Sequence, residues 1–396
     1  MLDQLEAIPA DPILGLSAAY REDPNPKKID LGVGVYKDET GVTPIMTAVS
    51  RATQRLMETE TSKSYLPQAG VANFNTGMLE LNLGVDHPAL LSGRADSVQA
   101  PGGCGALRIG SEVLNRSKAG AKVWLSDPSW PNHYPLLEGA GLELQIYPYY
   151  NAAEHKIDFE AMLQSLQQAA AGDVVLLHGC CHNPCGADLS FEQWQVLTEL
   201  ANEKGFTPFV DAAYQGLAKG LDEDAAGWRW MAAKVPEMLI ASSCSKNFGL
   251  YRERTGALIV ITQSAEQTAV VKSQAMNAAR QIYSMPPSHG GALAGVILAD
   301  SELRAMWESE LGEMRDRINT MRSELVKRLA AAGYENFAFI QNQFGMFSFL
   351  GISSEQVQKL RDDYAIYMVG STRMNVAGLT PDNIEYFADS LIAVLK

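Results

Sequence analysis

Two residues that could do chemistry follow apolar segments in the middle of the chain. Asp211 ends the apolar segment 207–211, and Lys246 follows the apolar segment 238–243. A lysine that leaves a buried strand is desolvated, so its pKa falls and its amine can act as a nucleophile. A carboxylate at a buried strand end is costly unless a cation or hydrogen-bond donors meet it. Alternatively, Asp211 only caps the following helix and Lys246 is a surface residue.

Two turns could bind a ligand. The segment 101–106 (PGGCGA) precedes a helix-like run, and glycines that open a helix let backbone N–H groups converge on an anion. Its spacing is neither that of a Walker loop nor GxGxxG, so a nucleotide is not indicated. Trp130 lies in the proline-flanked turn 127–133, where its flat face could stack on a ring. Either feature could instead be structural, as a turn without a ligand or a tryptophan that covers the core.

The segment 178–185 contains a group of residues that resembles a metal site. Its members are His178, Cys180, Cys181, His182 and Cys185. Metal sites need spacings that let ligands converge, such as two distant C-x₂-C pairs, and the sequence has no second pair. We therefore expect no metal, and Asn183-Pro184 is interpreted as a turn that projects an amide into a cleft. The odd number of cysteines, 5 in a large chain, predicts a reducing cytoplasm rather than disulfides.

Alternating strands and helices must position these residues. Strands are predicted at 97–100, 122–126, 174–178, 207–211, 238–243 and 256–262, with helical stretches such as 191–204 between them. Most are continuous apolar runs, which indicates an α/β fold with a mainly parallel sheet covered on both faces. Ligands bind outside the carboxyl ends of such strands. The two turns, Asn183, Asp211, Tyr214, Lys246 and Arg254 all follow strands, and together they are the set that a pyridoxal phosphate site needs.

The two ends of the chain are predicted to join in a second, smaller domain. One helix begins at Asp11-Pro12 and ends at Asp23-Pro24, and a long helical segment covers 300–332. Beyond it we predict strands at 337–340, 346–349 and 366–369, a helix opened by Ser353 and Gln356, and a last helix opened by Thr380-Pro381. The predicted division is an N-terminal arm 1–12, small-domain segments 13–43 and 314–396, and a large cofactor-binding domain 44–313.

The composition excludes some classes of partner. The 396 residues include 32 Lys and Arg against 46 Asp and Glu, which gives a net charge of −14. So acidic a chain, without a Lys/Arg block, is a poor partner for nucleic acid or an anionic membrane. The sequence shows no signal peptide and no apolar run of the roughly 18 residues that a membrane span requires.

The lysine segment SKNFGLYRER (245–254) leads to a family resemblance. The chain resembles class I aminotransferases, specifically the aspartate/aromatic aminotransferase group, over nearly its whole length. Further motifs of that group are LGVGVYKD (31–38), YLP (65–67), GCGALR (103–108), PSWPNH (128–133), CHNPCG (181–186), DAAYQG (211–216) and RMNVAG (373–378). The resemblance implies fold type I of the pyridoxal-phosphate transferases, with pyridoxal 5′-phosphate as cofactor.

The resemblance implies roles for residues around the cofactor ring. Lys246 would form a Schiff base with the cofactor and would later carry the proton of the substrate's α-carbon. Asp211, backed by His133, would keep the ring nitrogen protonated. The other ring contacts would come from Tyr214, Asn183 and Trp130.

It also implies how the phosphate and the substrate are bound. The phosphate ligands would be Gly103, Cys104, Ser243 and Arg254. Tyr65 would reach the phosphate of the neighbouring subunit, which implies a homodimer with shared active sites. The substrate's α-carboxylate would be bound by Arg373, Asn183, Trp130 and the backbone of Gly34. Arg280 matches the arginine that receives a second carboxylate across the dimer interface.

Three departures from the family pattern bear on the substrate. Cys104 stands where aspartate enzymes typically carry Thr, and Ser64 and Met285 stand where they have Asn. Losing two amides leaves a more apolar pocket wall, so we expect transfer from aromatic (Phe, Tyr, Trp) as well as dicarboxylic (Asp, Glu) donors to a 2-oxo acid such as 2-oxoglutarate. The alternative is a strict aspartate aminotransferase. A pyridoxal-phosphate β-lyase or decarboxylase is disfavoured by Arg280, and a metal-binding module would rest on 178–185 alone.

Overall fold

The centre of the molecule is a seven-stranded sheet. The computed structural model describes residues 1–7 and 12–396, and the strand order is β2-β10-β9-β8-β7-β3-β4. The strands are β2 (Ala95–Pro101), β3 (Lys122–Asp127), β4 (Glu143–Pro148), β7 (Val174–His178), β8 (Thr207–Ala212), β9 (Met238–Ser243) and β10 (Thr255–Ile261). All neighbours pair in parallel except β10, which is antiparallel to β2 and β9. The six predicted strands and the α/β class are thus confirmed, whereas β4 was not predicted.

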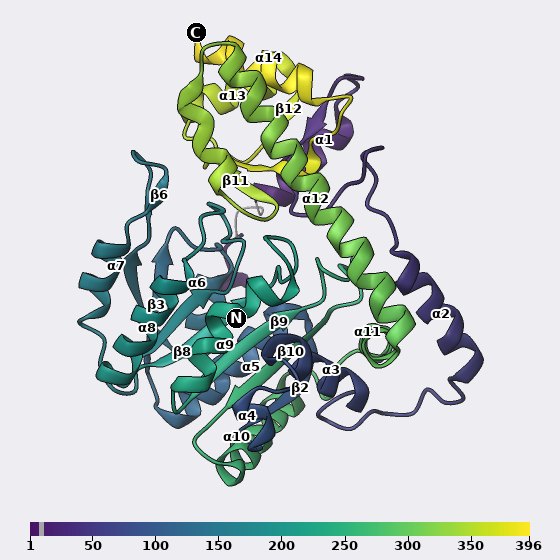
Figure 1. Ribbon diagram of the computed structural model, residues 1–396, viewed down its shortest axis with the longest axis vertical. Helices are drawn as coiled ribbons and strands as arrows, with labels where there is room; N and C mark the ends of the chain where they lie inside the picture. Colours follow the sequence, from purple (N-terminus) through teal and green to yellow (C-terminus); the bar gives the residue numbers. More distant parts are fainter. Residues whose placement is uncertain (8–11) are drawn as a thin grey trace.

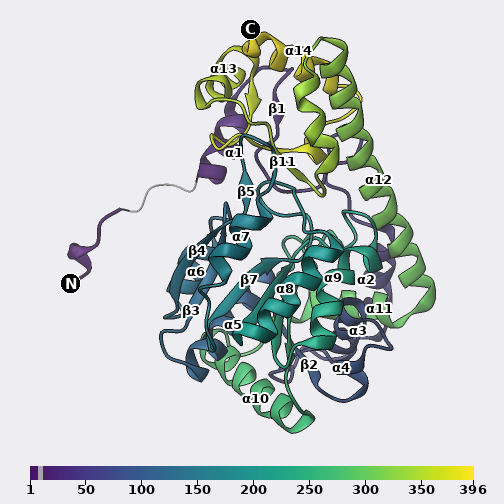
Figure 2. The same cartoon turned by 60° about the vertical axis from the view of Figure 1, so that its left-hand side comes forward.

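Helices cover both faces of this sheet (Figures 1 and 2). They are α3 (Ala72–Leu83), α4 (Pro88–Leu91), α5 (Gly102–Ser117), α6 (His133–Glu138), α7 (Phe159–Leu166), α8 (Phe191–Lys204), α9 (Leu221–Lys234), α10 (Ala265–Ile282) and α11 (Ser288–Ala299). Helix α2 (Thr47–Thr59) lies farther from the sheet, beside α11 (Figure 1). The predicted helix 191–204 is therefore confirmed as α8. Within residues 1–7 and 12–396, none of the helices has both the length and the apolar character needed to cross a membrane.

Successive residues of the central strands pack into opposite cores, because side chains alternate across a strand. Leu176 and Phe209 pack in the core that also contains residues of α5 and α10. Leu177 and Val210 pack on the other face, in the core that contains residues of α8 and α9. This two-sided burial explains why the strands are continuous apolar runs in the sequence.

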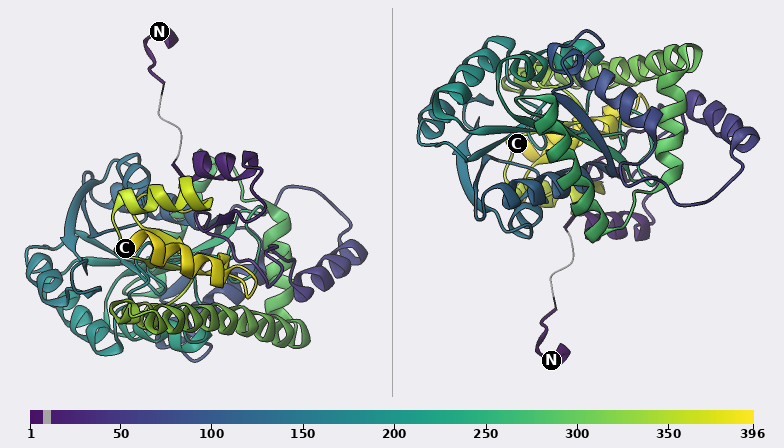
Figure 3. Two further views of the ribbon diagram at one scale, coloured as in Figure 1. Left: turned by 90° about the horizontal axis from the view of Figure 1, so that it is seen from above. Right: turned by 90° about the horizontal axis from the view of Figure 1, so that it is seen from below.

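The remaining elements form the upper part of the view in Figure 1, with α12 descending along one side. They are α1 (Pro12–Glu22), β1 (Ile29–Asp30), α12 (Ser301–Ala331), η2 (Glu335–Asn342), β11 (Phe347–Phe349), α13 (Ser354–Tyr364), β12 (Ile366–Tyr367), β13 (Arg373–Asn375), η3 (Val376–Gly378) and α14 (Ile384–Leu395). Two short pairings tie them together: β1 is parallel to β12, and β11 is antiparallel to β13. Elsewhere the chain forms η1 (Leu2–Gln4) and the two-stranded pair of β5 (Tyr150–Asn151) and β6 (Lys156–Ile157). Seen from above, α14 lies over the body of the molecule and α12 runs along one edge (Figure 3).

We propose the domain division 1–12, 13–43 with 314–396, and 44–313. It is supported by the pairing of β1 with β12, which joins the segments before 43 and after 314. The proposed boundary at 313/314 lies inside α12, the long helix that runs from the large sheet to the upper part of Figure 1. A continuous helix of 31 residues can link two such bodies without an irregular linker.

The C-terminal predictions are partly confirmed. The predicted long helix is α12, and Ser353 and Gln356 form a capping box that opens α13. The strand predicted at 337–340 is wrong: these residues belong to the 3₁₀ helix η2. Phe337 and Ile340 are both buried, and a spacing of three residues places them on one face of a 3₁₀ helix. Two other predicted strands are shorter than expected, because β11 begins at Phe347 and β12 ends at Tyr367.

Both terminal helices begin or end close to their predicted positions. Helix α1 ends at Glu22, before Asp23-Pro24 as predicted, whereas the proposed N-cap Asp11 lies outside the described residues. Helix α14 begins at Ile384, three residues after Pro381. The intervening residues form a turn in which the Thr380 N–H donates to Asn383 Oδ1 at 2.8 Å, so Thr380-Pro381 opens the turn and not the helix.

Candidate active site

A cavity of about 250 Å³ lies at the carboxyl ends of the central strands. Predicted site residues that line it are Gly34, Gly103, Cys104, Trp130, Asn183, Asp211, Tyr214, Ser243, Lys246, Arg254 and Arg373. The strand register explains part of this convergence, because Asp211 of β8 lies opposite His178 of β7 and Ala241 of β9. Three predicted residues, Tyr65, His133 and Arg280, do not line the cavity.

Asp211 is the buried acid of the cavity. Its Oδ2 lies 2.9 Å from His133 Nε2, and His133 Nδ1 lies 2.8 Å from Ser129 Oγ. Burial alone would raise the pKa of Asp211, but the hydrogen bond and positive potential of His133 outweigh it, so the pKa lies below the usual value. Asp211 is therefore ionised at neutral pH. Its Oδ1 is buried and has no hydrogen-bond partner among the described residues.

His178 extends this hydrogen-bonded chain. Its Nε2 lies 3.1 Å from Ser129 Oγ, and burial, reinforced by the proximity of His133, lowers the pKa of His178 to about 3. A neutral imidazole therefore lies behind the carboxylate. His178 was not predicted to line the cavity, although its position at the end of the apolar run 174–178 was a usable signal.

Lys246 lies just beyond the end of β9, as predicted. Its Nζ is 4.7 Å from the centroid of the Tyr214 ring. Burial lowers the pKa of Lys246, although the negative charge of Asp211 partly opposes that effect. Burial raises the pKa of Tyr214 above its usual value, so the phenol remains protonated. An amine with a lowered pKa is suited both to attack a carbonyl carbon and to carry a proton.

The first turn of α5 forms a cradle for an anion. Gly102 has a φ of +71°, and a Cβ on it would lie 2.5 Å from Arg254 Nη2, so glycine is needed there. The Arg254 guanidinium donates to the Tyr251 carbonyl at 2.9 Å, and none of the described carboxylates pairs with it. The helix N-terminus, Ser243 and this unpaired arginine together provide positive potential and donors for a phosphate.

Arg373 reaches the cavity from β13, which pairs with β11 outside the seven-stranded sheet. It is only 5% exposed, donates to the Gly32 carbonyl at 2.7 Å, and donates to Asn183 Oδ1 at 3.3 Å. Its guanidinium lies 4.3 Å from the centroid of the Phe347 ring, and burial lowers its pKa. No carboxylate among the described residues pairs with it. A buried guanidinium with free donors is suited to a planar carboxylate ligand.

Tyr65 and Arg280 lie on the surface of the single chain. Tyr65 is 90% exposed, and Arg280 is also exposed, with its Nη1 donating to Ser284 Oγ at 2.9 Å. The segments that carry them touch, because the Leu66 N–H donates to Met285 Sδ at 3.3 Å. Within one chain, therefore, neither residue reaches the cavity.

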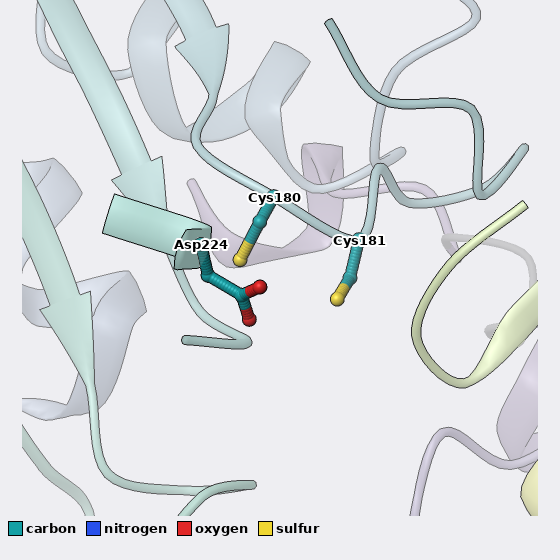
Figure 4. A group of neighbouring side chains, drawn as sticks. All are labelled: Cys180, Cys181 and Asp224. Carbon is teal, nitrogen blue, oxygen red and sulfur yellow. The ribbon is translucent and has the colours of Figure 1, made fainter. Parts of the chain in front are cut away.

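The Cys/His group of 178–185 does not converge. His182 lies 3.1 Å from Ser126 Oγ and 3.2 Å from Cys185 Sγ, whereas Cys180 and Cys181 point toward Asp224 (Figure 4). Both oxygens of Asp224 already accept backbone N–H groups, which come from Gly216, Ala218, Lys219 and Gly220. These four donors occupy the lone pairs that a metal would need. The absence of a metal stays a prediction.

Sequence reasoning missed other residues that line the cavity. They are Leu107, Ala213, Ser245, Tyr251 and Phe347, in addition to His178. Ser245 and Tyr251 lie within the recognised lysine segment, which was a local signal. Phe347 had no such local signal. It lies in the short strand β11, far along the chain from the lysine segment, and its sequence context does not distinguish it from an aromatic residue of the core.

Comparisons with known proteins agree with this geometry. The family model "Aminotransferase class I and II" matches residues 26–391. The aspartate aminotransferase of Salmonella typhi is 50% identical, with all of both chains covered. The aromatic-amino-acid aminotransferase of Pseudomonas aeruginosa is 48% identical over 98% of this chain and 97% of its own.

Solved structures agree as well. The aromatic-amino-acid aminotransferase from Burkholderia pseudomallei, described as covalently bound to pyridoxal phosphate, superposes with a TM-score of 0.98 at 45% identity, covering 100% of both chains. The chain belongs to the aminotransferase class I and II family.

Proposed function

We propose that this aminotransferase uses pyridoxal 5′-phosphate to move an amino group between an L-amino acid and a 2-oxo acid. The observation that carries the proposal is the convergence of Lys246, Asp211 and Arg373 on one cavity. The three residues differ in chemistry: Lys246 is an amine of lowered pKa, Asp211 is an ionised buried carboxylate, and Arg373 is a buried guanidinium without a counter-ion among the described residues. Together they suit a reaction that needs a nucleophilic amine, a partner for a protonated ring nitrogen and a receptor for a carboxylate.

The residues of the cavity fit this cofactor. The buried Asp211 Oδ1, which has no partner among the described residues, would accept a hydrogen bond from a protonated ring nitrogen. The glycine turn of α5 and Arg254 would hold the phosphate. When bound, the cofactor supplies an aldehyde carbon and a ring that withdraws electrons from the substrate's α-carbon.

The protein's own residues would then divide the remaining work. Lys246 Nζ would take the α-proton of the substrate and return it, because burial lowers its pKa and so makes the neutral amine that accepts a proton easier to form. Arg373 would fix the α-carboxylate through its two-pronged guanidinium. The roles expected for Tyr214, Asn183, Trp130, Cys104 and Ser243 around the cofactor, and for Gly34 near the substrate, are supported by their position on the cavity wall.

We propose that the enzyme acts as a homodimer with shared active sites. Tyr65 is a large side chain with 90% of its surface exposed, and Ile45 and Met57 in the same part of the chain are 77% and 80% exposed. Exposed apolar side chains of this size suggest a protein interface. In a dimer, Tyr65 and Arg280 would complete the cavity of the partner subunit. A reducing cytoplasm is proposed in addition, supported by five cysteines that are all unpaired.

Replacing Asp211 with Asn is expected to slow the reaction of bound cofactor with an amino acid by about a hundredfold or more. The substitution removes the negative charge that stabilises a protonated ring nitrogen, while the size of the side chain stays nearly the same. The measurement is the single-turnover rate, followed by the cofactor's absorbance. The matched control is Asp96→Asn, which changes an acid of β2 whose partner is Lys272. An unchanged rate for Asp211→Asn would refute this role.

The donor range is proposed to include aromatic and dicarboxylic amino acids. Met285 and Ser64 give the proposed side-chain pocket an apolar thioether and a hydroxyl, and the thioether already receives the Leu66 N–H. A kinetic panel of Phe, Tyr, Trp and Asp with 2-oxoglutarate is expected to give turnover with every donor. Turnover with Asp and none with the aromatic donors would establish the alternative, a strict aspartate aminotransferase.

A further inference from the structure

Arg322 is a fully buried arginine on α12 that lies outside the cavity. It is 2% exposed, and none of the described carboxylates pairs with it. Its guanidinium instead donates to the carbonyls of Gly345 and Phe347, at 2.7 and 2.9 Å. It also donates to the Ile340 carbonyl at 3.2 Å and makes a short hydrogen bond to Ser348 Oγ. All four acceptors belong to the segment 340–348, which joins η2 to β11.

This segment presents Phe347 to the cavity. The two carbonyls that Arg322 binds most closely are those of Phe347 itself and of Gly345, two residues before it, so the guanidinium fixes the backbone on both sides of Met346. The ring of Phe347 lies beneath the guanidinium of Arg373. The tip of the ring is so close to Gly34 that a Cβ there would lie 2.8 Å from Phe347 Cζ. A shift of the ring would therefore change the surroundings of Arg373.

The same turn also packs on the loop that carries Asn183. The Phe344 N–H donates to the Gly186 carbonyl at 2.7 Å. A Cβ on Gly345, whose φ is +72°, would lie 2.7 Å from Cys181 Sγ. The segment that Arg322 holds thus contains Phe347, whose ring lies under Arg373, and it also contacts the loop that carries Asn183.

Holding a turn with a buried cation costs free energy of desolvation. Burial lowers the pKa of Arg322 to about 10, which reflects the cost of removing a guanidinium from water. Its five N–H groups form a rigid planar fork that can bind several carbonyls at once, whereas a lysine presents a single charge and three donors on a flexible stem. The residue is suited to fixing a backbone segment in one position.

We propose that Arg322 is a positioning residue for the carboxylate site, holding the segment 340–348 so that Phe347 supports Arg373. This inference rests on the proposed function in one respect, that Arg373 receives the substrate's α-carboxylate. Arg322 itself does not line the cavity.

The test compares Arg322→Lys with Arg317→Lys in the cofactor-loaded enzyme. Arg317 is a matched control: it lies on the same helix and donates to backbone carbonyls, those of Asp38, Ala377 and Leu379, none of which lines the cavity. The probe is 3-phenylpropionate, which has a carboxylate but no amino group and therefore binds without reacting. Its Kd is measured by fluorescence titration. For Arg322→Lys we expect about a tenfold higher Kd, a similarly raised KM for Phe and Asp, a smaller change in kcat and an unchanged cofactor spectrum. Arg317→Lys should leave the Kd within about twofold of the wild type.

The outcomes separate this inference from the proposed function. A folded Arg322→Lys variant with wild-type Kd, or an equal rise in the Arg317→Lys control, would overturn the positioning role alone. A wild-type enzyme that neither binds 3-phenylpropionate nor transaminates would instead overturn the proposed function. If Arg322→Lys does not fold, Ser348→Ala removes one of the four acceptors and leaves Arg322 in place. A severalfold rise in Kd would then support the proposal, and an unchanged Kd would contradict it.

Discussion

Replacing Lys246 with Ala is expected to reduce the rate of transamination by about 10⁴-fold or more. Lys246 is the amine that lines the cavity, and its pKa is lowered by burial. The variant would lose both the attachment point for the cofactor aldehyde and the group that carries the α-proton. The measurement is steady-state turnover of Asp or Phe with 2-oxoglutarate, together with the absorbance of the bound cofactor.

A lysine outside the cavity provides the control. Lys234 lies on α9, with its Nζ 5.0 Å from the centroid of the Trp230 ring, and Lys234→Ala should keep wild-type turnover. Adding a small primary amine such as methylamine should restore part of the lost rate in Lys246→Ala, because a free amine can carry the proton in place of the side chain. Near wild-type turnover in Lys246→Ala without added amine would contradict the assignment of Lys246.

Two arginine variants are expected to separate the two carboxylates of a dicarboxylic substrate. Arg373→Leu should reduce kcat/KM for Asp and Phe alike, because both present the same α-carboxylate to a buried guanidinium that has no carboxylate partner among the described residues. Arg280→Leu should reduce kcat/KM for Asp and spare Phe. Leaving a desolvated carboxylate unpaired costs about 3–5 kcal/mol, which corresponds to roughly 10²–10⁴-fold.

The measurement is single-turnover kinetics of both variants with Asp and Phe as donors. Arg116→Leu is a suitable control, because among the described residues this exposed arginine of α5 bonds only to residues of α10. Equal losses for Asp and Phe in Arg280→Leu would show that Arg280 does not receive the distal carboxylate. Since Arg280 does not line the cavity of its own chain, a selective loss would also support the shared site of the proposed homodimer.

Much of the large sheet could be predicted because the apolar runs of its strands agree with their burial between two layers of helices. Strands β7 and β9 match their predicted bounds, since short continuous apolar runs flanked by polar turns are typical of strands that are covered by helices on both faces. The strand predicted at 337–340 failed for a local reason. Phe337 and Ile340 lie on one face of a 3₁₀ turn but would lie on opposite faces of a strand, and only the packing against α12 buries them on one face.

For the site, the sequence by itself determined which residues meet at the carboxyl ends of the sheet. Asp211 and Lys246 follow neighbouring strands, and parallel strands necessarily end at the same edge. The tertiary structure alone decided how the cavity is closed from the other side. Arg373 was expected at the site from its motif, but the structure shows that it reaches the cavity together with Phe347 through the pairing of two three-residue strands. Arg322 holds that segment from a helix with no local signal of this role. Such contacts depend on how the elements around β11 and β13 pack against the large sheet and its helices. That packing depends on the sum of many weak side-chain contacts, not on any motif.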